Sequence, residues 1–354
     1  MRLFKCTKCD QPVYFENTYC LHCHSLLGFV AEKLQPVALK AENNGLYSFE
    51  EDGKKTFYKF CSNRQYAVCN WLLPAESNAL FCKACEPNRI IPNLGKAEHF
   101  ERWQKIELAK HRLVYQLLRM RLNLAHEGKD KGLAISFNFM SDEPGGNSEP
   151  VLTGHHNGMI TINIAEADNP ERERIRKDMH EDYRTLLGHF RHEIGHYYWH
   201  SLVDNPDMLQ RFRSVFGNES IDYTAALKKY YSEGIRVNWA DNYISAYASM
   251  HPWEDWAETW AHYMHIMDTL ETACSFGLSV NPQVTAEGLR ADIKTDPYTT
   301  EDFDAIMSWW HPLTLAVNSL NRSMGLSDIY PFVLTATVKA KMKFIHGLVK
   351  NSYC

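Results

Sequence analysis

One five-residue segment, His192-Glu193-Ile194-Gly195-His196, combines residue types and spacing that suit metal chemistry. On a helix, four residues correspond to about 400°, so both imidazoles emerge from one face and can share one Zn²⁺. Glu193 lies between them, where it can take a proton from a zinc-activated water and pass it to a leaving amine. With 17 histidines in the chain, such a match arises by chance in roughly one chain in twenty. Two unrelated core or surface histidines with an incidental glutamate are the alternative, so the motif needs partners elsewhere.

A catalytic zinc also needs a third protein ligand and one open coordination position. A metzincin-type third histidine requires Gly at 199 and His at 202, but Trp199 and Leu202 stand there. Further along, Pro252 starts a predicted helix on which Glu254 and Glu258 share one face. One carboxylate can bind the metal while the other accepts the outer N–H of a ligand histidine. A solvated acidic turn at a helix start explains the same residues without a metal.

The cysteines form two further groups with metal-ligand spacing. Eight of the ten precede residue 86, and such crowding in C-x-x-C knuckles is typical of metal binding rather than of a disulfide framework. The first group has two knuckles and predicts a closed S₄ structural zinc site; free thiols or a rubredoxin-type iron site are the alternatives. Because so short a segment buries little apolar surface, metal binding would drive its folding. The ligands of this group are Cys6, Cys9, Cys20 and Cys23.

The second group has only one complete knuckle and predicts a second structural zinc held by Cys61, Cys69, Cys82 and Cys85. His22, His24 or His99 could replace one of these cysteines, although each is more typical of a surface histidine. Cofactors are therefore expected to be one catalytic and two structural zinc ions.

The charge of the N-terminal part argues against nucleic-acid binding. Residues 1–95 hold 11 Lys+Arg and 9 Asp+Glu, and eight thiolates with two Zn²⁺ make this balance negative. Phosphate binding needs a basic surface. A protein partner, or packing against the rest of the chain, is the better hypothesis for the cysteine-rich part.

The overall composition is that of a globular protein. Hydrophobic residues make up 45% and charged residues 23% of the 354, and the net charge is −5. No apolar run approaches the roughly 20 residues that span a bilayer, and the first residues do not resemble a secretory signal. With the reduced cysteines, this predicts a cytoplasmic protein that does not bind membranes.

The elements that must position the His-Glu-His segment follow from hydrophobic periodicity. A helix is predicted at 97–124, strands at 133–140 and 160–164, helical segments from 168 to about 202, and mostly helices after 206. Residues 1–28 are expected to form a zinc ribbon, 29–95 a second cysteine module and 96–354 the catalytic domain. The predicted fold is α+β, a zinc-ribbon region followed by a mainly helical domain with a small mixed sheet.

Substrate binding can also be predicted from this order of elements. The strand at 160–164 alternates apolar and polar residues shortly before the zinc helix, and an exposed edge strand could bind an extended peptide through main-chain hydrogen bonds. The loop at 141–158 would then cover the cleft. A strand paired on both sides explains the alternation equally well.

The downstream carboxylates also carry a resemblance. Tyr247, Glu254, Ala257 and Glu258, in the pattern Tyr-x₆-Glu-x₂-Ala-Glu, resemble the gluzincins related to anthrax lethal factor. This resemblance implies that Glu254 is the third zinc ligand, that Glu258 orients a zinc-bound histidine and that Tyr247 stabilises the oxyanion. Asp255, next in sequence to Glu254, is expected to be dispensable for the metal.

The whole chain resembles the bacterial family of zinc-binding metallopeptidases that carry an N-terminal zinc ribbon. The matching stretches are 69–71, 190–199, 251–263 and 318–325. The resemblance implies a zinc peptidase acting on a peptide or protein substrate, with Glu193 as general base. The alternative is a zinc-ribbon adaptor whose peptidase-like domain binds a partner protein or peptide without cleaving it, yet a pure binder has no need for Glu193.

Overall fold

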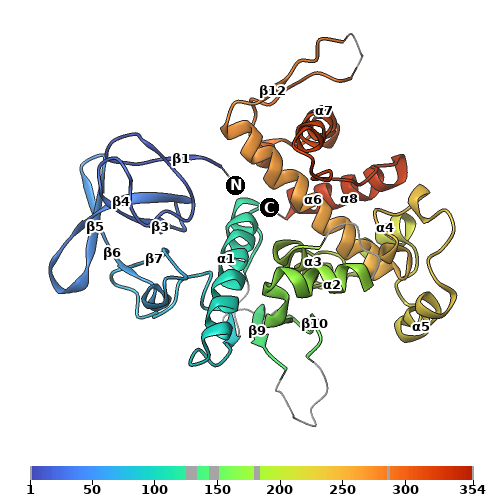
Figure 1. Ribbon diagram of the computed structural model, residues 1–354, viewed down its shortest axis with the longest axis horizontal. Helices are drawn as coiled ribbons and strands as arrows, with labels where there is room; N and C mark the ends of the chain where they lie inside the picture. The colour runs from blue at the N-terminus through green and yellow to red at the C-terminus, as the bar shows by residue number, and fades with distance from the viewer. Residues whose placement is uncertain (1, 125–133, 143–150, 179–183, 285–287, 353–354) are drawn as a thin grey trace.

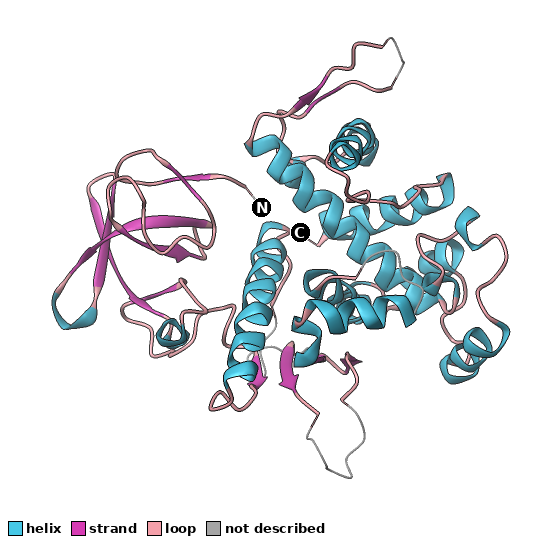
Figure 2. Cartoon of the chain, in the orientation of Figure 1, coloured by secondary structure: helices cyan, strands magenta, loops and turns pink. Residues whose placement is uncertain are grey.

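The computed structural model describes residues 2–124, 134–142, 151–178, 184–284 and 288–352. It is an α+β protein whose strands gather toward the N-terminal end, while helices make up most of the rest (Figure 1). Figure 2 shows the long helix α1 (Ala97–Arg119) standing between these two parts. No helix in the described ranges is long and apolar enough to cross a membrane.

The N-terminal part contains a small hairpin and a five-stranded antiparallel sheet. The hairpin consists of β1 (Phe4–Lys5) and β2 (Pro12–Val13). The sheet runs in chain order through β3 (Leu26–Val30), β4 (Gln35–Ala41), β5 (Tyr47–Glu51), β6 (Lys54–Phe60) and β7 (Leu72–Pro74). A β-bridge from Phe29 to Trp71 brings the first and last strands together, so the sheet curls on itself. The sequence analysis did not predict this sheet, because its strands are short and their pairing is set by turns and long-range contacts.

Both cysteine groups contribute to one hydrophobic core beneath this sheet. Phe15, Phe29 and Trp71 pack there against Tyr115 of α1. The boundary predicted between residues 28 and 29 falls inside β3. Because α1 supplies part of this core, the cysteine-rich part is packed against the helical part.

A small mixed sheet lies beside α1. Its strands are β8 (Asn88–Ile90), β9 (Ser136–Met140), β10 (Gly154–His156) and β11 (Met159–Asn163), in the order β10-β11-β9-β8. β11 pairs antiparallel with β10 and parallel with β9. The prediction that residues 160–164 form an edge strand is therefore wrong, and β10 is the edge strand on that side. Alternation of apolar and polar residues shows that a strand is half-buried but does not reveal its neighbours.

The remaining chain is helical. It comprises α2 (Asn169–Asp178), α3 (Leu186–Leu202), α4 (Pro206–Phe216), α5 (Tyr223–Glu233), α6 (Pro252–Ser275), α7 (Phe303–Ser323) and α8 (Ala336–Asn351), with a two-residue pair β12 (Ser279–Val280) and β13 (Ala291–Asp292) before α7. The prediction that Pro252 begins a helix is confirmed: the proline is in the first turn and the His251 side chain caps it by accepting from the Trp253 N–H at 3.0 Å.

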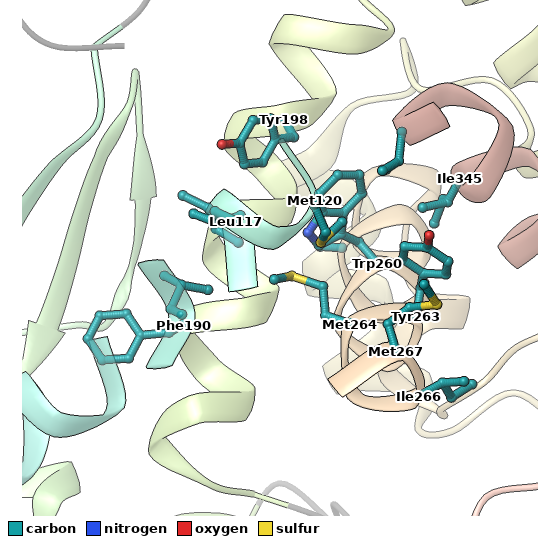
Figure 3. Close-up of a cluster of buried hydrophobic side chains, with 14 of the residues drawn as sticks. Leu117, Met120, Phe190, Tyr198, Trp260, Tyr263, Met264, Ile266, Met267 and Ile345 are labelled. Carbon is teal, nitrogen blue, oxygen red and sulfur yellow. The ribbon is translucent and has the colours of Figure 1, made fainter. Parts of the chain in front are cut away.

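The main core lies between α1, α3, α6 and α8 (Figure 3). On α6, Trp256, Trp260 and Tyr263 are essentially inaccessible to solvent, so these aromatic residues form part of the core. Met264 and Met267 continue the same buried face of α6 toward α1.

Candidate metal centre

The close approach of α3 and α6 builds the candidate catalytic site. A Cβ at Gly195 would lie 3.2 Å from both Ala257 Cα and Trp260 Cβ, so a larger residue would push the two helices apart by a few tenths of an ångström. The indole N–H of Trp256 donates to the Gly195 carbonyl at 2.8 Å and fixes their register. This packing carries the first turn of α6 to the face of α3 that bears the two histidines.

Three side-chain atoms converge at that point. The distances are 3.2 Å between the Nε2 atoms of His192 and His196, 3.1 Å from His192 Nε2 to Glu254 Oε2 and 3.6 Å from His196 Nε2 to Glu254 Oε2. Tetrahedral zinc with bonds of about 2.0–2.1 Å separates its ligand atoms by roughly 3.3 Å. Glu254 Oε2 is also buried without a hydrogen-bond partner, which a bound cation would satisfy. The donor set and its spacing therefore fit Zn²⁺.

The two histidines are oriented in different ways. His192 Nδ1 donates to Glu258 Oε1 at 2.7 Å, and Ser245 Oγ donates to the other oxygen of Glu258 at 2.7 Å. His196 instead packs against Trp253, with ring centroids 4.3 Å apart. Burial works against a charged His192, but the neighbouring carboxylates of Glu254 and Glu258 outweigh burial and raise the pKa of this imidazole well above its usual value. These two carboxylates therefore favour positive charge at this point of the cleft.

A cavity of about 490 Å³ is lined by His192 of this group. Glu193, 7% exposed, and Tyr247, in a short helical turn at 247–249, both line it. The structure thus brings Glu193, Tyr247 and Glu258 to one cleft beside His192. The volume lies in the range of small-molecule and peptide sites.

Two residues beside the metal ligands were missed or set aside in the sequence analysis. Tyr223, at the start of α5, donates its hydroxyl hydrogen to Glu254 Oε1 at 2.9 Å and interacts with the hydroxyl of Tyr247. His155, on β10, is the second residue: the centroid of its ring lies 6.0 Å from that of His196 and the two rings are stacked. No local pattern marks either residue, because each reaches the site through tertiary packing.

Asp255 points away from the metal ligands. Its carboxylate forms a buried ion pair with Lys341 of α8 at 2.6 Å. Adjacent positions on a helix are about 100° apart, so Glu254 and Asp255 cannot face the same partner. Asp255 is thus a structural residue at the packing of α6 against α8, and it is not in the group of three metal-ligand residues.

Another part of the cleft wall is charged. Glu166 accepts from His189 Nδ1 at 2.6 Å and pairs with Arg184 at 3.2 Å. Burial works to raise the pKa of Glu166, but its contacts with His189, Arg184 and Thr153 outweigh burial and lower this pKa to about 2. Glu166 therefore places an ionised carboxylate in the wall of the cleft.

The first cysteine group also has metal-ligand geometry. The Sγ atoms of Cys6 and Cys23 are 3.7 Å apart and those of Cys9 and Cys20 are 3.6 Å apart. Tetrahedral zinc with bonds of about 2.3 Å to sulfur separates its thiolates by roughly 3.8 Å. All four thiols are free of disulfides and lie within one group, so they fit a closed zinc site.

The second cysteine group is fully buried and has a histidine beside it. Cys61, Cys69, Cys82 and Cys85 converge, with 3.6 Å between the Sγ atoms of Cys69 and Cys82. The histidine is His111 of α1, whose Nε2 lies 3.3 Å from Cys69 Sγ. His22, His24 and His99 are not in any of the described metal-binding groups. Because α1 supplies His111, the second cysteine group is joined to the helical part by a polar contact as well as by core packing.

The fold and its side-chain groups define a zinc-ribbon protein with a metallopeptidase-like domain. A zinc-ribbon family model matches residues 3–96, and the family described as "putative zinc-binding metallo-peptidase" matches residues 99–348. The chain belongs to this metallopeptidase family.

The similar proteins come from mycobacteria. The uncharacterized proteins Mb2598c of Mycobacterium bovis and MT2644 and Rv2568c of Mycobacterium tuberculosis are each 38% identical over 350 residues, covering 99% of this chain and 95% of the relative. The similarity therefore extends over the ribbon and the helical part together. No solved structure matches the chain.

Proposed function

We propose that the chain is a zinc-dependent peptidase of the gluzincin type, with Zn²⁺ held by His192, His196 and Glu254. The observation that carries this proposal is the position of Glu193: it lines the cleft beside three ligand atoms that have tetrahedral spacing. A zinc ion held there supplies Lewis-acid activation of water and of the scissile carbonyl. An adaptor that only binds peptides would not need a carboxylate at this place.

Each side chain around the zinc site then has its own role in peptide hydrolysis. Glu193 accepts the proton of the attacking water and transfers it to the leaving amine. Tyr247 donates its hydroxyl hydrogen to the oxygen that becomes negative during the attack. Glu258 keeps His192 in the tautomer whose Nε2 faces the ligand group. Tyr223 holds one oxygen of Glu254 so that the other faces the two histidines.

Peptide binding is assigned to β10 in place of β11. β10 is the edge strand of the sheet, and His155 places it directly beside His196. An extended substrate can add to such an edge through main-chain hydrogen bonds. The two cysteine groups are proposed to hold structural zinc. A protein partner for the ribbon and a cytoplasmic location stay predictions.

Removing and restoring zinc tests the function. Dialysis against a mild chelator should strip the open site first, because closed S₄ sites bind their metal as part of folding. Cleavage of a lysate-derived peptide library, followed by mass spectrometry, should cease while the circular dichroism spectrum is unchanged. Adding Zn²⁺ should restore the same cleavages. Absence of cleavage by the zinc-loaded protein would contradict the proposal.

Tyr223→Phe tests how Glu254 is held. Loss of the hydroxyl removes the donor to Glu254 Oε1, and loss of a hydrogen bond that orients a ligand weakens zinc binding by about 10–100-fold. Competition with a chromophoric chelator measures this change in the intact protein. Tyr231→Phe, on the exposed face of the same helix, is the matched control. Equal zinc affinity in the two variants would exclude this role for Tyr223.

A further inference from the structure

A second, smaller cavity adjoins the catalytic cleft. It measures about 70 Å³ and is lined by residues of α6, α7 and the segment 329–332. Three residues, His262, His265 and Phe332, line both this cavity and the cleft. The small cavity is therefore a side chamber that shares its wall with the cleft.

The polar groups around the chamber bind one another. The Asn318 side chain donates to the Tyr330 carbonyl at 2.8 Å and accepts from the Tyr330 N–H at 3.1 Å. The Tyr330 hydroxyl is 2.9 Å from His262 Nδ1. These contacts fix the segment 329–332 against α7, and they occupy the side-chain amide of Asn318 and Nδ1 of His262.

Most of the remaining lining is apolar, with His265, Thr269 and Thr314 as its other polar residues. Trp310, Leu313 and Val317 of α7 face Phe332, whose ring packs 4.2 Å from that of His262. No Asp, Glu, Lys or Arg is among the described residues that line the chamber. Burial lowers the pKa of His262 to about 4, so this wall is neutral near pH 7. A charged ligand group would lose hydration there without gaining a partner.

The chamber's size and position restrict what it can hold. A group of the size of a water molecule needs roughly 10–15 Å³ of cavity volume, so the chamber holds about five such groups. This is the size of a Leu, Ile or Met side chain. His262 follows Glu258 by one turn and Glu254 by two turns of α6, which is about 12 Å from the ligand carboxylate along the helix axis. An extended peptide covers that distance in about three or four residues.

We propose that this chamber is a specificity pocket that binds an uncharged aliphatic side chain of the substrate, within about three residues of the scissile bond. The proposal rests on the peptidase function and adds the substrate class to it. Replacing the preferred Leu, Ile or Met by Ala should lower kcat/KM by at least about 10-fold, because a hydrophobic pocket discriminates by roughly 10–200-fold for a single methylene.

Two substitutions at Val317 test the pocket in opposite directions. Val317→Phe fills it and should shift cleavage of a peptide library toward Ala and Gly at the selected position. Val317→Ala enlarges it and should shift cleavage toward Phe. Val284→Phe, at an exposed valine that lines neither cavity, is the matched control and should keep the wild-type preference. The melting temperature and zinc content of every variant show whether it is folded.

The outcomes separate the two proposals. No cleavage by zinc-loaded wild type would refute the peptidase function itself. Cleavage without an aliphatic preference would overturn the specificity pocket while leaving the peptidase function intact. The specificity pocket would also be overturned if both Val317 variants were folded and kept the aliphatic preference of the wild type. If one Val317 variant does not fold, the shift or constancy of preference in the other decides.

Discussion

Glu193→Gln should lower the rate of peptide hydrolysis by about 10²–10⁴-fold, the usual contribution of a positioned general base. Glutamine keeps the shape of the side chain but cannot accept the proton of the attacking water. Because Glu193 is not one of the three residues whose ligand atoms converge, the variant should contain as much zinc as the wild type. Comparing peptides released from a lysate-derived library by the wild type and by the variant measures the loss.

The controls for this variant are measurements of its zinc content and of its melting temperature. Zinc content and melting temperature equal to those of the wild type would show that only the chemistry is lost. If the variant cleaves the library as fast as the wild type, Glu193 is not the base. If neither protein cleaves, the adaptor alternative gains support.

Asp255→Ala should destabilise the helical part by about 3–5 kcal/mol, because it leaves the Lys341 ammonium buried without its counter-charge. For a domain of this size the melting temperature should fall by roughly 6–20 °C, which scanning calorimetry measures. Asp304→Ala removes an equivalent 2.6 Å pair with Lys343, also between an aspartate and α8 but exposed to solvent. It should leave the melting temperature nearly unchanged.

A double substitution at Asp255 and Lys341 distinguishes the contribution of the ion pair from the contribution of side-chain packing. Asp255→Leu with Lys341→Met replaces both charges with apolar side chains and should recover much of the stability, since an apolar pair of similar volume often matches a buried ion pair. A small effect of Asp255→Ala, comparable to that of Asp304→Ala, would show that this ion pair does not hold α6 against α8.

Local patterns in the sequence were sufficient to predict the parts of the site that lie on single helices. His192 and His196 are one turn apart, and Glu254 and Glu258 are one turn apart, so helical periodicity alone places each pair on one face. Pro252 marked the start of α6 correctly. The convergence of the two pairs could only be inferred from family resemblance, because it depends on the approach of α3 to α6 at Gly195.

Features that depend on pairing between distant segments were not predictable in this way. The edge position belongs to β10, a three-residue strand whose existence depends on its pairing with β11. Tyr223 and His111 reach their sites from α5 and α1, about 30 and 40 residues from the ligands they contact. The partner of Asp255 comes from α8, and nothing adjacent to Asp255 in the sequence indicates it.

The central claim is that His192, His196 and Glu254 hold a zinc ion separate from the two cysteine-bound ions. Inductively coupled plasma mass spectrometry of wild type and Glu254→Ala, each purified without added metal, tests it most directly. The wild type should contain about three zinc ions per chain and the variant about two, with both cysteine sites filled. An equal zinc content in the two folded proteins would contradict the claim.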